Sequence, residues 1–352
     1  MMTGDELSYN VKKHGEFYAQ KDFSGMDCRN IDLSGAIFTQ VRFDGCDFRS
    51  ADLHDAIFSD CSFVRAKFNQ AILSGTTYVK CNCRQVEMQN AQMLKTKFIE
   101  SDFTEASFTG SELENCVFQQ VKLQQSSFSK AMMEVGVFNE CDLQGVSFAG
   151  AKLNKSIFYE SQFAHNDFSR STVTLSCFAK ARFDQVDFSG LDFNQTQFIE
   201  GYLVNCNFSY AKLNQVGFMQ AELCNSRFDY AEMEFANFYE ANLENVSMEK
   251  ANLQKASMQK AKFIKTNVLS ANLEMAQLTD IVVKDSYFAY SNMTYADLSN
   301  AIIQDSNFSN TELFQAKMHE TFDENTIWDG ANRSAAQQTD PVKQKAEQWG
   351  KK

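Results

Sequence analysis

Hydrophobic residues recur at every fifth position over most of this chain. From Phe23 to Met318, all 60 positions whose numbers end in 3 or 8 hold Phe, Leu, Met, Val, Ile, Tyr or Cys. An α-helix buries residues with a period of about 3.6 and a strand with a period of about 2, so neither element alone produces this spacing. The period therefore predicts a repeat architecture.

A smaller residue stands two positions before each of these hydrophobic residues. Positions whose numbers end in 1 or 6 hold small residues (Ala, Gly, Val, Cys, Ser or Thr) as far as Ala316, and the exceptions are Lys21, Met26, Ile31, Asn166, Leu191 and Ile281. Each five-residue unit thus directs one large and one small side chain inward. The other three positions are mostly polar, as solvated positions are.

Units such as Ala51-Asp52-Leu53 and Ala296-Asp297-Leu298-Ser299-Asn300 resemble the pentapeptide-repeat family. The resemblance covers about residues 21–320. It implies an all-β fold, a right-handed, four-sided parallel β-helix with one unit on each side and four units in each coil. Such a solenoid would have about fifteen coils, with short caps at its ends.

Residue choice at intervals of twenty agrees with four units in each coil. One such row is aromatic throughout: Phe38, Phe58, Tyr78, Phe98, Phe118, Phe138, Phe158, Phe178, Phe198, Phe218 and Phe238. The row that begins at Leu33 has no aromatic residue before Phe193. Because 29 of the 33 Phe residues occupy the central hydrophobic position, we assign phenylalanine to the core.

We expect one elongated domain with short ends. Residues 1–20 are predicted to be an N-terminal cap or lead-in, residues 21–320 the β-helix, and residues 321–352 a closing segment with a polar, flexible tail. Thr326-Ile327-Trp328 is the candidate for closing the last coil. A short helix over Val342 to Trp349, docked by Trp349, is compatible with the sequence.

The chain is acidic, with a net charge of −12 and a pI of about 4.9. This charge argues against a basic surface for nucleic acid or anionic membranes, so we predict no direct nucleic-acid binding. No segment approaches the roughly 20 apolar residues of a membrane span. Met1 to Leu7 lack a cationic-then-apolar signal. A cytoplasmic location follows, although export without a cleaved signal would leave the same sequence.

The ten cysteines and four histidines do not suggest catalysis or metal binding. Most cysteines occupy inward positions, where free thiols substitute for small apolar residues, so we predict reduced core cysteines rather than disulfides or metal ligands. The histidines are scattered along the repeat, and a convex surface without long loops predicts no pocket. We therefore predict a non-enzymatic protein without a cofactor.

One side of the predicted coils carries outward apolar residues. These neighbours of the central phenylalanines form a candidate partner-binding stripe: Ile37, Ile57, Val79, Ile99, Val117, Val137, Ile157, Tyr159, Ile199 and Tyr239. An exposed apolar stripe indicates an interface, and a side-by-side homodimer is the simplest one. The alternative is that β-branched residues merely suit strand ladders.

The same side carries a row of acids two residues after the phenylalanines. This candidate acidic rail comprises Asp60, Glu100, Glu140, Glu160, Glu200 and Glu240, and Lys80, Lys180 and Lys260 interrupt it. Such a row would imitate a phosphate backbone. Alternatively, it would simply be a solvated edge that keeps the protein soluble.

Two functions follow from these patterns and from the resemblance. The first is a protein–protein interaction scaffold in a bacterium, related to secretion, because Gly15–Gly25 is similar to entries into repeats attached to type VI secretion accessory proteins. The alternative is a DNA mimic that binds DNA gyrase or topoisomerase and protects it from quinolones, as some pentapeptide-repeat proteins do. This chain is longer than those proteins usually are and has no register-breaking loop. We therefore rank the scaffold first.

Overall fold

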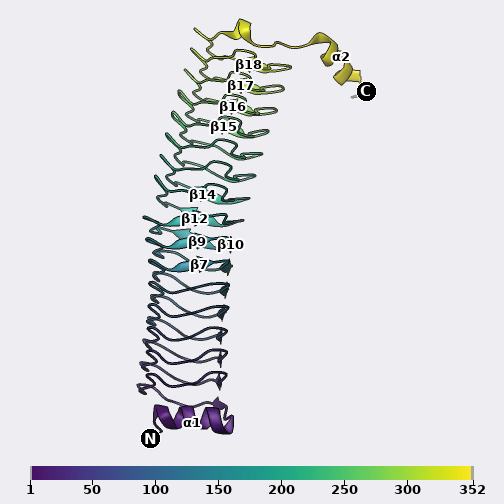
Figure 1. Cartoon of the computed structure of the whole chain (residues 1–352). Coiled ribbons are helices and arrows are strands. Elements are labelled where there is room, and N and C mark those ends of the chain that lie inside the picture. The colour runs from purple at the N-terminus through teal and green to yellow at the C-terminus, as the bar shows by residue number, and fades with distance from the viewer. Residues whose placement is uncertain (1, 350–352) are drawn as a thin grey trace. The chain divides into compact units, whose positions relative to one another are not determined.

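The computed structural model describes residues 2–349, apart from the side chain of Gln348, and separates into two compact units, Met1–Arg182 and Phe183–Lys352. Both units consist of stacked parallel coils of a β-solenoid, about fifteen in all (Figure 1). The predicted all-β parallel β-helix is confirmed.

Residues twenty apart lie side by side in neighbouring coils. Ile37 pairs with Ile57 and Phe38 with Phe58 in parallel register. Between two coils, the Phe43 amide donates to the Ser62 carbonyl at 2.7 Å, and the Ser62 amide donates to the Val41 carbonyl at 3.0 Å. Four five-residue units therefore make one coil, as the twenty-residue rows predicted.

Each side of a coil ends at a corner residue with a left-handed backbone. Every residue from Gly15 to Gly330 whose number ends in 0 or 5 has a positive φ. Most of these corner residues are Asn, Gln, Lys, Glu or Asp rather than glycine. Asparagine and aspartate tolerate this region better than most side chains, and β-branched residues tolerate it least.

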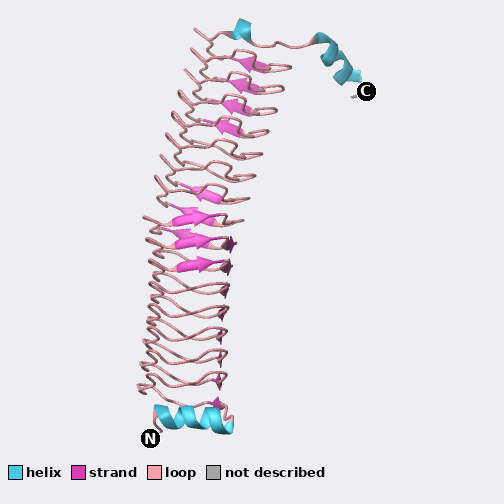
Figure 2. Cartoon of the chain, viewed as in Figure 1, coloured by secondary structure: helices cyan, strands magenta, loops and turns pink. Residues whose placement is uncertain are grey.

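In the first unit, strands form on three sides of the coils (Figure 2). An eight-stranded sheet lies on the Phe38 side, defined as residues 37–39 and the residues twenty apart from them. Its strands are β1 (Tyr18–Ala19), β2 (Ile37–Thr39), β3 (Ile57–Ser59), β4 (Thr77–Val79), β5 (Lys97–Ile99), β6 (Val117–Gln119), β8 (Val137–Asn139) and β10 (Ile157–Tyr159). A smaller sheet lies on the Leu53 side, defined as residues 52–54 and the residues twenty apart from them. Its strands are β7 (Met132–Glu134), β9 (Lys152–Asn154) and β12 (Thr172–Thr174). The third side carries β11 (Gln162–Ala164).

The later strands occupy the same position in the coil as β11, at intervals of twenty residues, and not the Phe38 side. They are β13 (Arg182–Asp184), β14 (Tyr202–Val204), β15 (Lys262–Ile264), β16 (Val282–Lys284), β17 (Ile302–Gln304) and β18 (Phe322–Glu324). The last four form one parallel sheet, in which Val282 pairs with Ile302 and Ile302 with Phe322. Elsewhere the coils meet through single bridges such as Asn252 with Asn272.

A helix that the sequence reading did not predict covers the first coil. α1 (Gly4–His14) begins with a capping box, in which the Thr3 side chain accepts from the Glu6 amide and the Glu6 side chain accepts from the Thr3 amide. Leu7 and Val11 are buried beneath the helix. The Ser8 hydroxyl donates to the Asp32 carbonyl at 2.7 Å. The helix thus caps backbone groups that the first coil would otherwise expose (Figure 1).

The core consists of the central residues of the five-residue units. Every central residue from Cys28 to Met318 is buried, and only Phe23, in the first coil, is half-buried. Aromatic rings stack from coil to coil, as between Phe118 and Phe138, whose centroids lie 4.4 Å apart. The predicted assignment of phenylalanine to the core is confirmed.

The C-terminal segment contains two short helices, η1 (Arg333–Ala335) and α2 (Pro341–Trp349). The Trp328 ring stacks on Phe308 at 4.7 Å and extends the core into the closing segment. Trp349 is 84% exposed, so the expectation that it docks the helix was wrong. Met1 and Gly350–Lys352, which fall in the predicted lead-in and tail, lie outside the described residues.

Candidate functional surfaces

The outward positions of the eight-stranded sheet carry the predicted stripe in the first unit. Ile37, Ile57 and Ile157 are 40–48% exposed. Val79, Ile99, Val117, Val137 and Tyr159 are half-buried. Val117, Val137 and Ile157 pair in one register row, so three successive coils present an apolar side chain at the same position. Each covers part of its neighbour, which explains their partial burial.

Polar residues interrupt the stripe. In the row before the phenylalanines, Thr77 and Lys97 separate Ile57 from Val117. In the row after them, Gln119 and Asn139 separate Ile99 from Tyr159. Among the stripe residues of the first unit, the longest uninterrupted run is therefore Val117 to Ile157.

Ile199 and Tyr239 belong to the second unit, and both are half-buried. The Lys260 ammonium lies 5.3 Å from the centre of the Tyr239 ring and donates to its hydroxyl at 3.0 Å. Tyr239 is thus engaged by a neighbouring coil.

The acidic rail alternates with cations and amides. In the first unit, Asp60, Glu100, Glu140 and Glu160 are exposed corner residues. Lys80 pairs with Glu100 at 3.6 Å, and Lys180 pairs with Glu160 at 3.9 Å. The Gln120 amide donates to Glu140 at 2.9 Å. The rail therefore carries less net charge than its acids alone suggest.

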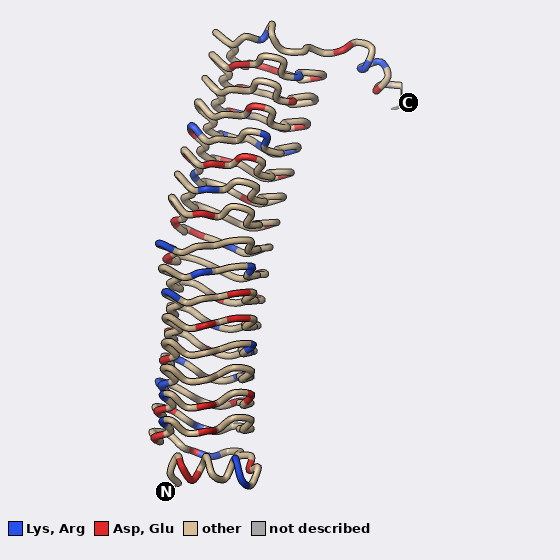
Figure 3. Tube along the Cα trace, in the orientation of Figure 1, with Lys and Arg blue, Asp and Glu red and all other residues tan. Residues whose placement is uncertain are grey.

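The rail residues of the second unit show the same pairing. Glu200 is exposed, and Glu240 is half-buried. The Gln220 amide donates to Glu240 at 2.9 Å, and Lys260 lies 3.4 Å from its carboxylate. These contacts, the Gln220 hydrogen bond first, lower the pKa of Glu240. Figure 3 shows acidic and basic residues interleaved along the coils.

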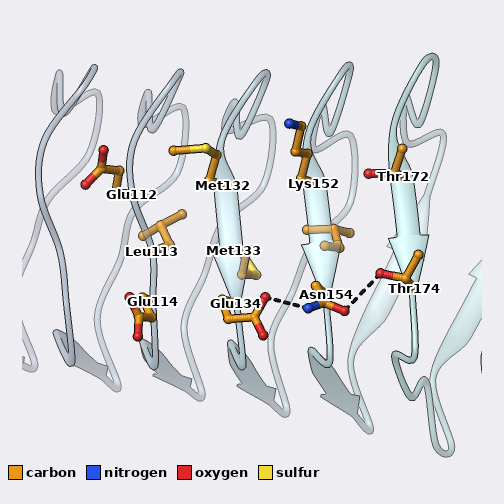
Figure 4. A pocket seen from close by; sticks show the side chains of 11 residues that line it. Glu112, Leu113, Glu114, Met132, Met133, Glu134, Lys152, Asn154, Thr172 and Thr174 are labelled. Carbon is orange, nitrogen blue, oxygen red and sulfur yellow. Dashed lines mark hydrogen bonds between the residues drawn. The ribbon is translucent and has the colours of Figure 1, made fainter.

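A hollow of about 490 Å³ lies on the Leu53 side of the first unit, across β7, β9 and β12 (Figure 4). The expectation of a convex surface without a pocket was therefore wrong. One row of its lining holds Glu112, Met132, Lys152 and Thr172, and the other holds Glu114, Glu134, Asn154 and Thr174. Leu113, Met133 and Leu153 form its apolar floor.

Hydrogen bonds order one edge of this hollow. The Asn154 amide donates to Glu134 at 2.5 Å, and the Thr174 hydroxyl donates to Asn154 at 2.9 Å. The hydrogen bond from Asn154 lowers the pKa of Glu134, and Lys155, 3.4 Å away, acts in the same direction. Glu134 is therefore ionised at neutral pH. No pattern in the sequence marks the hollow, because its residues follow the same five-residue pattern as their neighbours.

Helix α2 brings Glu347 close to His319 and Glu320, and these three residues are potential metal ligands. His319, Glu320 and Glu347 place one ligand atom each within 4.8 Å of one another. However, the His319 Nδ1 atom accepts from the Asp340 amide at 3.2 Å, and Nε2 lies 3.1 Å from Glu347. Since Nδ1 is an acceptor, Nε2 carries the hydrogen and donates to Glu347. The arrangement explains how α2 is held by the last coil.

The ten cysteines are free thiols. Eight are buried, and Cys177 and Cys224 are partly exposed. Burial raises the pKa of Cys116, Cys141 and Cys206 to about 12, so these thiols stay protonated and unreactive at neutral pH. Of the helices within residues 2–349, none has the length and apolar character that crossing a membrane requires.

Sequence profiles of known families identify the repeat. A profile described as "Pentapeptide repeat region" matches residues 101–178, and "Pentapeptide repeats (9 copies)" matches residues 23–67. "Pentapeptide repeats (8 copies)" matches residues 61–104, 202–245, 231–268 and 284–321. The chain belongs to the pentapeptide-repeat family. No protein among curated sequences is significantly similar to this pentapeptide-repeat chain.

Solved pentapeptide-repeat proteins share low identity with the chain. Full-length QnrB1, a plasmid-mediated fluoroquinolone resistance protein, is 16% identical over 61% of this chain and 94% of its own, with a TM-score of 0.32. HetL from Nostoc sp. strain PCC 7120, involved in heterocyst differentiation regulation, is 16% identical over 90% of this chain and 98% of its own, with a TM-score of 0.18. Rfr23 from Cyanothece 51142 is 18% identical over 41% of this chain and 91% of its own, with a TM-score of 0.21.

Proposed function

We propose that this pentapeptide-repeat protein is a non-enzymatic scaffold that binds a protein partner, or a second copy of itself, through the Phe38 side of its first unit. The observation that carries the proposal is the apolar row Val117, Val137 and Ile157, which stands in register on three successive coils. Ile37 and Ile57 add exposed apolar surface on the same side. Contiguous exposed apolar surface favours association.

The scaffold is compatible with a secretion-associated accessory or effector role in a bacterium. That finer assignment rests on the resemblance of Gly15–Gly25, a segment that joins α1 to the first coil through β1. Secretion genes beside the gene would support it, and topoisomerase or resistance genes would favour the DNA mimic.

The experiment places a charge inside the stripe. Val137→Glu with Ile157→Glu is expected to weaken association, because a charge buried at an interface without a partner is unfavourable. Sedimentation would measure self-association, and affinity capture would compare the partners retained by wild type and variant. Thermal melts would show whether the fold survives.

The matched control is Ile72→Glu with Leu94→Glu. These residues are 38% and 40% exposed on the Leu53 side of the same unit. Their substitution therefore removes a similar apolar area and adds the same charge. The proposal fails if the control weakens association as much as the stripe variant does. It also fails if the wild type is monomeric and retains no partner.

A further inference from the structure

Exposed apolar residues gather at the edge of the hollow on the Leu53 side. Met132 is 48% exposed within it. Val135 and Leu175 are 39% and 51% exposed at corners that follow this side. Val135 also immediately precedes the coil side that carries Val137. Met132, Val135 and Val137 thus carry apolar surface from the hollow toward the stripe.

Val135 is the residue least suited to its backbone. Its φ is 55°, in the left-handed region that β-branched side chains rarely adopt. The equivalent corners one coil before and after hold Asn115 and Lys155. Among the corner residues of residues 2–349, Val135 is the only β-branched one. Backbone strain of this kind persists most often at functional sites. An exposed valine here improves neither solubility nor backbone geometry.

The carboxylates of the hollow differ in the hydrogen bonds and ion pairs that they make. Glu134 is held by Asn154 and Lys155. Within residues 2–349, the exposed Glu112 carboxylate has no hydrogen bond or ion pair, and Glu114 has only a 3.3 Å contact from its neighbour Asn115. Two carboxylates with little internal compensation therefore lie one coil before Met132, with Glu112 beside Met132 and Glu114 beside Glu134, as Figure 4 shows.

We propose that this hollow is a docking site for a partner segment that carries a Lys or Arg beside an apolar residue. The cation pairs with Glu112 and Glu114, and the apolar side chain packs on Met132 and against Val135. Methionine suits this role because its flexible side chain adapts to varied apolar surfaces. Charge complementarity favours a cationic occupant over an acidic one. Lys152, on the next coil, marks where the acidic end of the site stops.

The inference goes beyond the proposed function, because it assigns a second surface and the chemistry of its occupant. The probe is a fluorescein-labelled peptide of alternating lysine and leucine, and a glutamate–leucine peptide of the same length is the negative probe. Fluorescence anisotropy with the full chain should show salt-sensitive binding of the cationic peptide alone. Glu112→Gln with Glu114→Gln should weaken that binding roughly fivefold to tenfold.

The matched charge control is Glu232→Gln with Glu234→Gln. These acids flank Met233 in the second unit as Glu112 and Glu114 flank Leu113, and the substitution removes the same charge. The control should bind the cationic peptide like the wild type. Equal losses of affinity in both variants would show that the binding is nonspecific electrostatic attraction and would overturn the proposal. Absence of peptide binding by the wild type would also overturn it.

Val135 supplies a readout that a purely structural role would not produce. Val135→Asn should raise the melting temperature, because asparagine fits a left-handed corner, and should weaken binding of the cationic peptide. Met275→Asn, at an exposed corner of the second unit, should leave binding unchanged. A Val135→Asn protein that binds normally would contradict the proposal.

Two further experiments distinguish binding at this site from binding at the stripe. The Val137→Glu and Ile157→Glu variant should still bind the cationic peptide through Glu112 and Glu114. If sedimentation instead shows self-association that disappears in the Glu112 and Glu114 variant, the occupant is a second copy of this chain, and the cationic segment is rejected.

Discussion

At the scale of single residues, each five-residue unit buries one large and one small side chain, and aromatic ladders hold successive coils together. The Phe138 ring lies between Phe118 and Phe158, with ring centroids 4.4 and 4.7 Å away and nearly parallel planes. Such a ring has neighbours on both faces, so the space it leaves cannot be filled by a small movement of one side chain.

Phe138→Ala should therefore cost roughly 3–5 kcal/mol in the free energy of unfolding, as other buried Phe truncations do. Phe235→Ala is the matched control, because Phe235 is 51% exposed at a corner. Chemical denaturation monitored by circular dichroism would measure both. Equal losses in the two variants would contradict the assigned five-residue register.

Some residue-level packing lies beyond what the period can predict. The Tyr78 hydroxyl is buried and has no hydrogen-bond partner within the described residues. Burial raises the pKa of Tyr78 well above its usual value, and the neighbouring thiol of Cys83 adds to the effect. Cys83 stands in the row where adjacent coils carry Phe63 and Phe103. The period marks both residues as buried, but only the structure brings the larger tyrosine together with the smaller cysteine.

At the scale of elements, the corners and coils follow from the sequence, whereas the strands do not. All sides of a coil share one polar and apolar pattern, yet strands lie on the Phe38 side in β2 to β6 and on another side in β15 to β18. The difference between these backbones is small, since neighbouring coils make the same parallel bridges in both cases. A pattern of burial cannot select between two backbones that bury the same residues.

α1 was missed although its sequence carries start and stop signals. Thr3 and Glu6 form the capping box, Leu7 and Val11 have the spacing of one helix face, and Gly15 ends the helix in the left-handed region. The signals span too few residues to stand out beside sixty repeats. What they encode is a cap, which a solenoid needs at its ends.

Leu7→Ala should loosen this cap. Leu7 is fully buried, and truncation of a buried leucine costs roughly 2–5 kcal/mol. Because solenoid stability is a sum over neighbouring coils, the loss should appear first as faster amide exchange in the first coil, at Cys28 and Leu33. Tyr9→Ala, on the exposed side of the same helix, is the control. Uniform acceleration of exchange throughout both units would argue against a local cap.

At the scale of the whole molecule, the repeat identifies the family but not the partner. The core residues must pack against the next coil, and this requirement restricts which residues each unit can hold. The outward residues are under no such requirement. Sequence alone placed Ile37, Ile57 and Ile157 outward, but it could not show that Lys80 and Lys180 pair with acids of the rail. It also could not reveal the hollow at Met132, which depends on which side chains reach across neighbouring coils.

These pairings determine how the DNA-mimic alternative should behave. A phosphate backbone is uniformly anionic, whereas the rail of the first unit alternates between acids, lysines and glutamine, and exposed ion pairs are further weakened by salt. Purified protein in a DNA gyrase supercoiling assay, with and without a quinolone, should therefore neither inhibit nor protect specifically. Charge reversal at Glu140, Glu160 and Glu200 should leave the assay unchanged. Salt-sensitive protection by the wild type that disappears on charge reversal would establish the mimic and displace the scaffold.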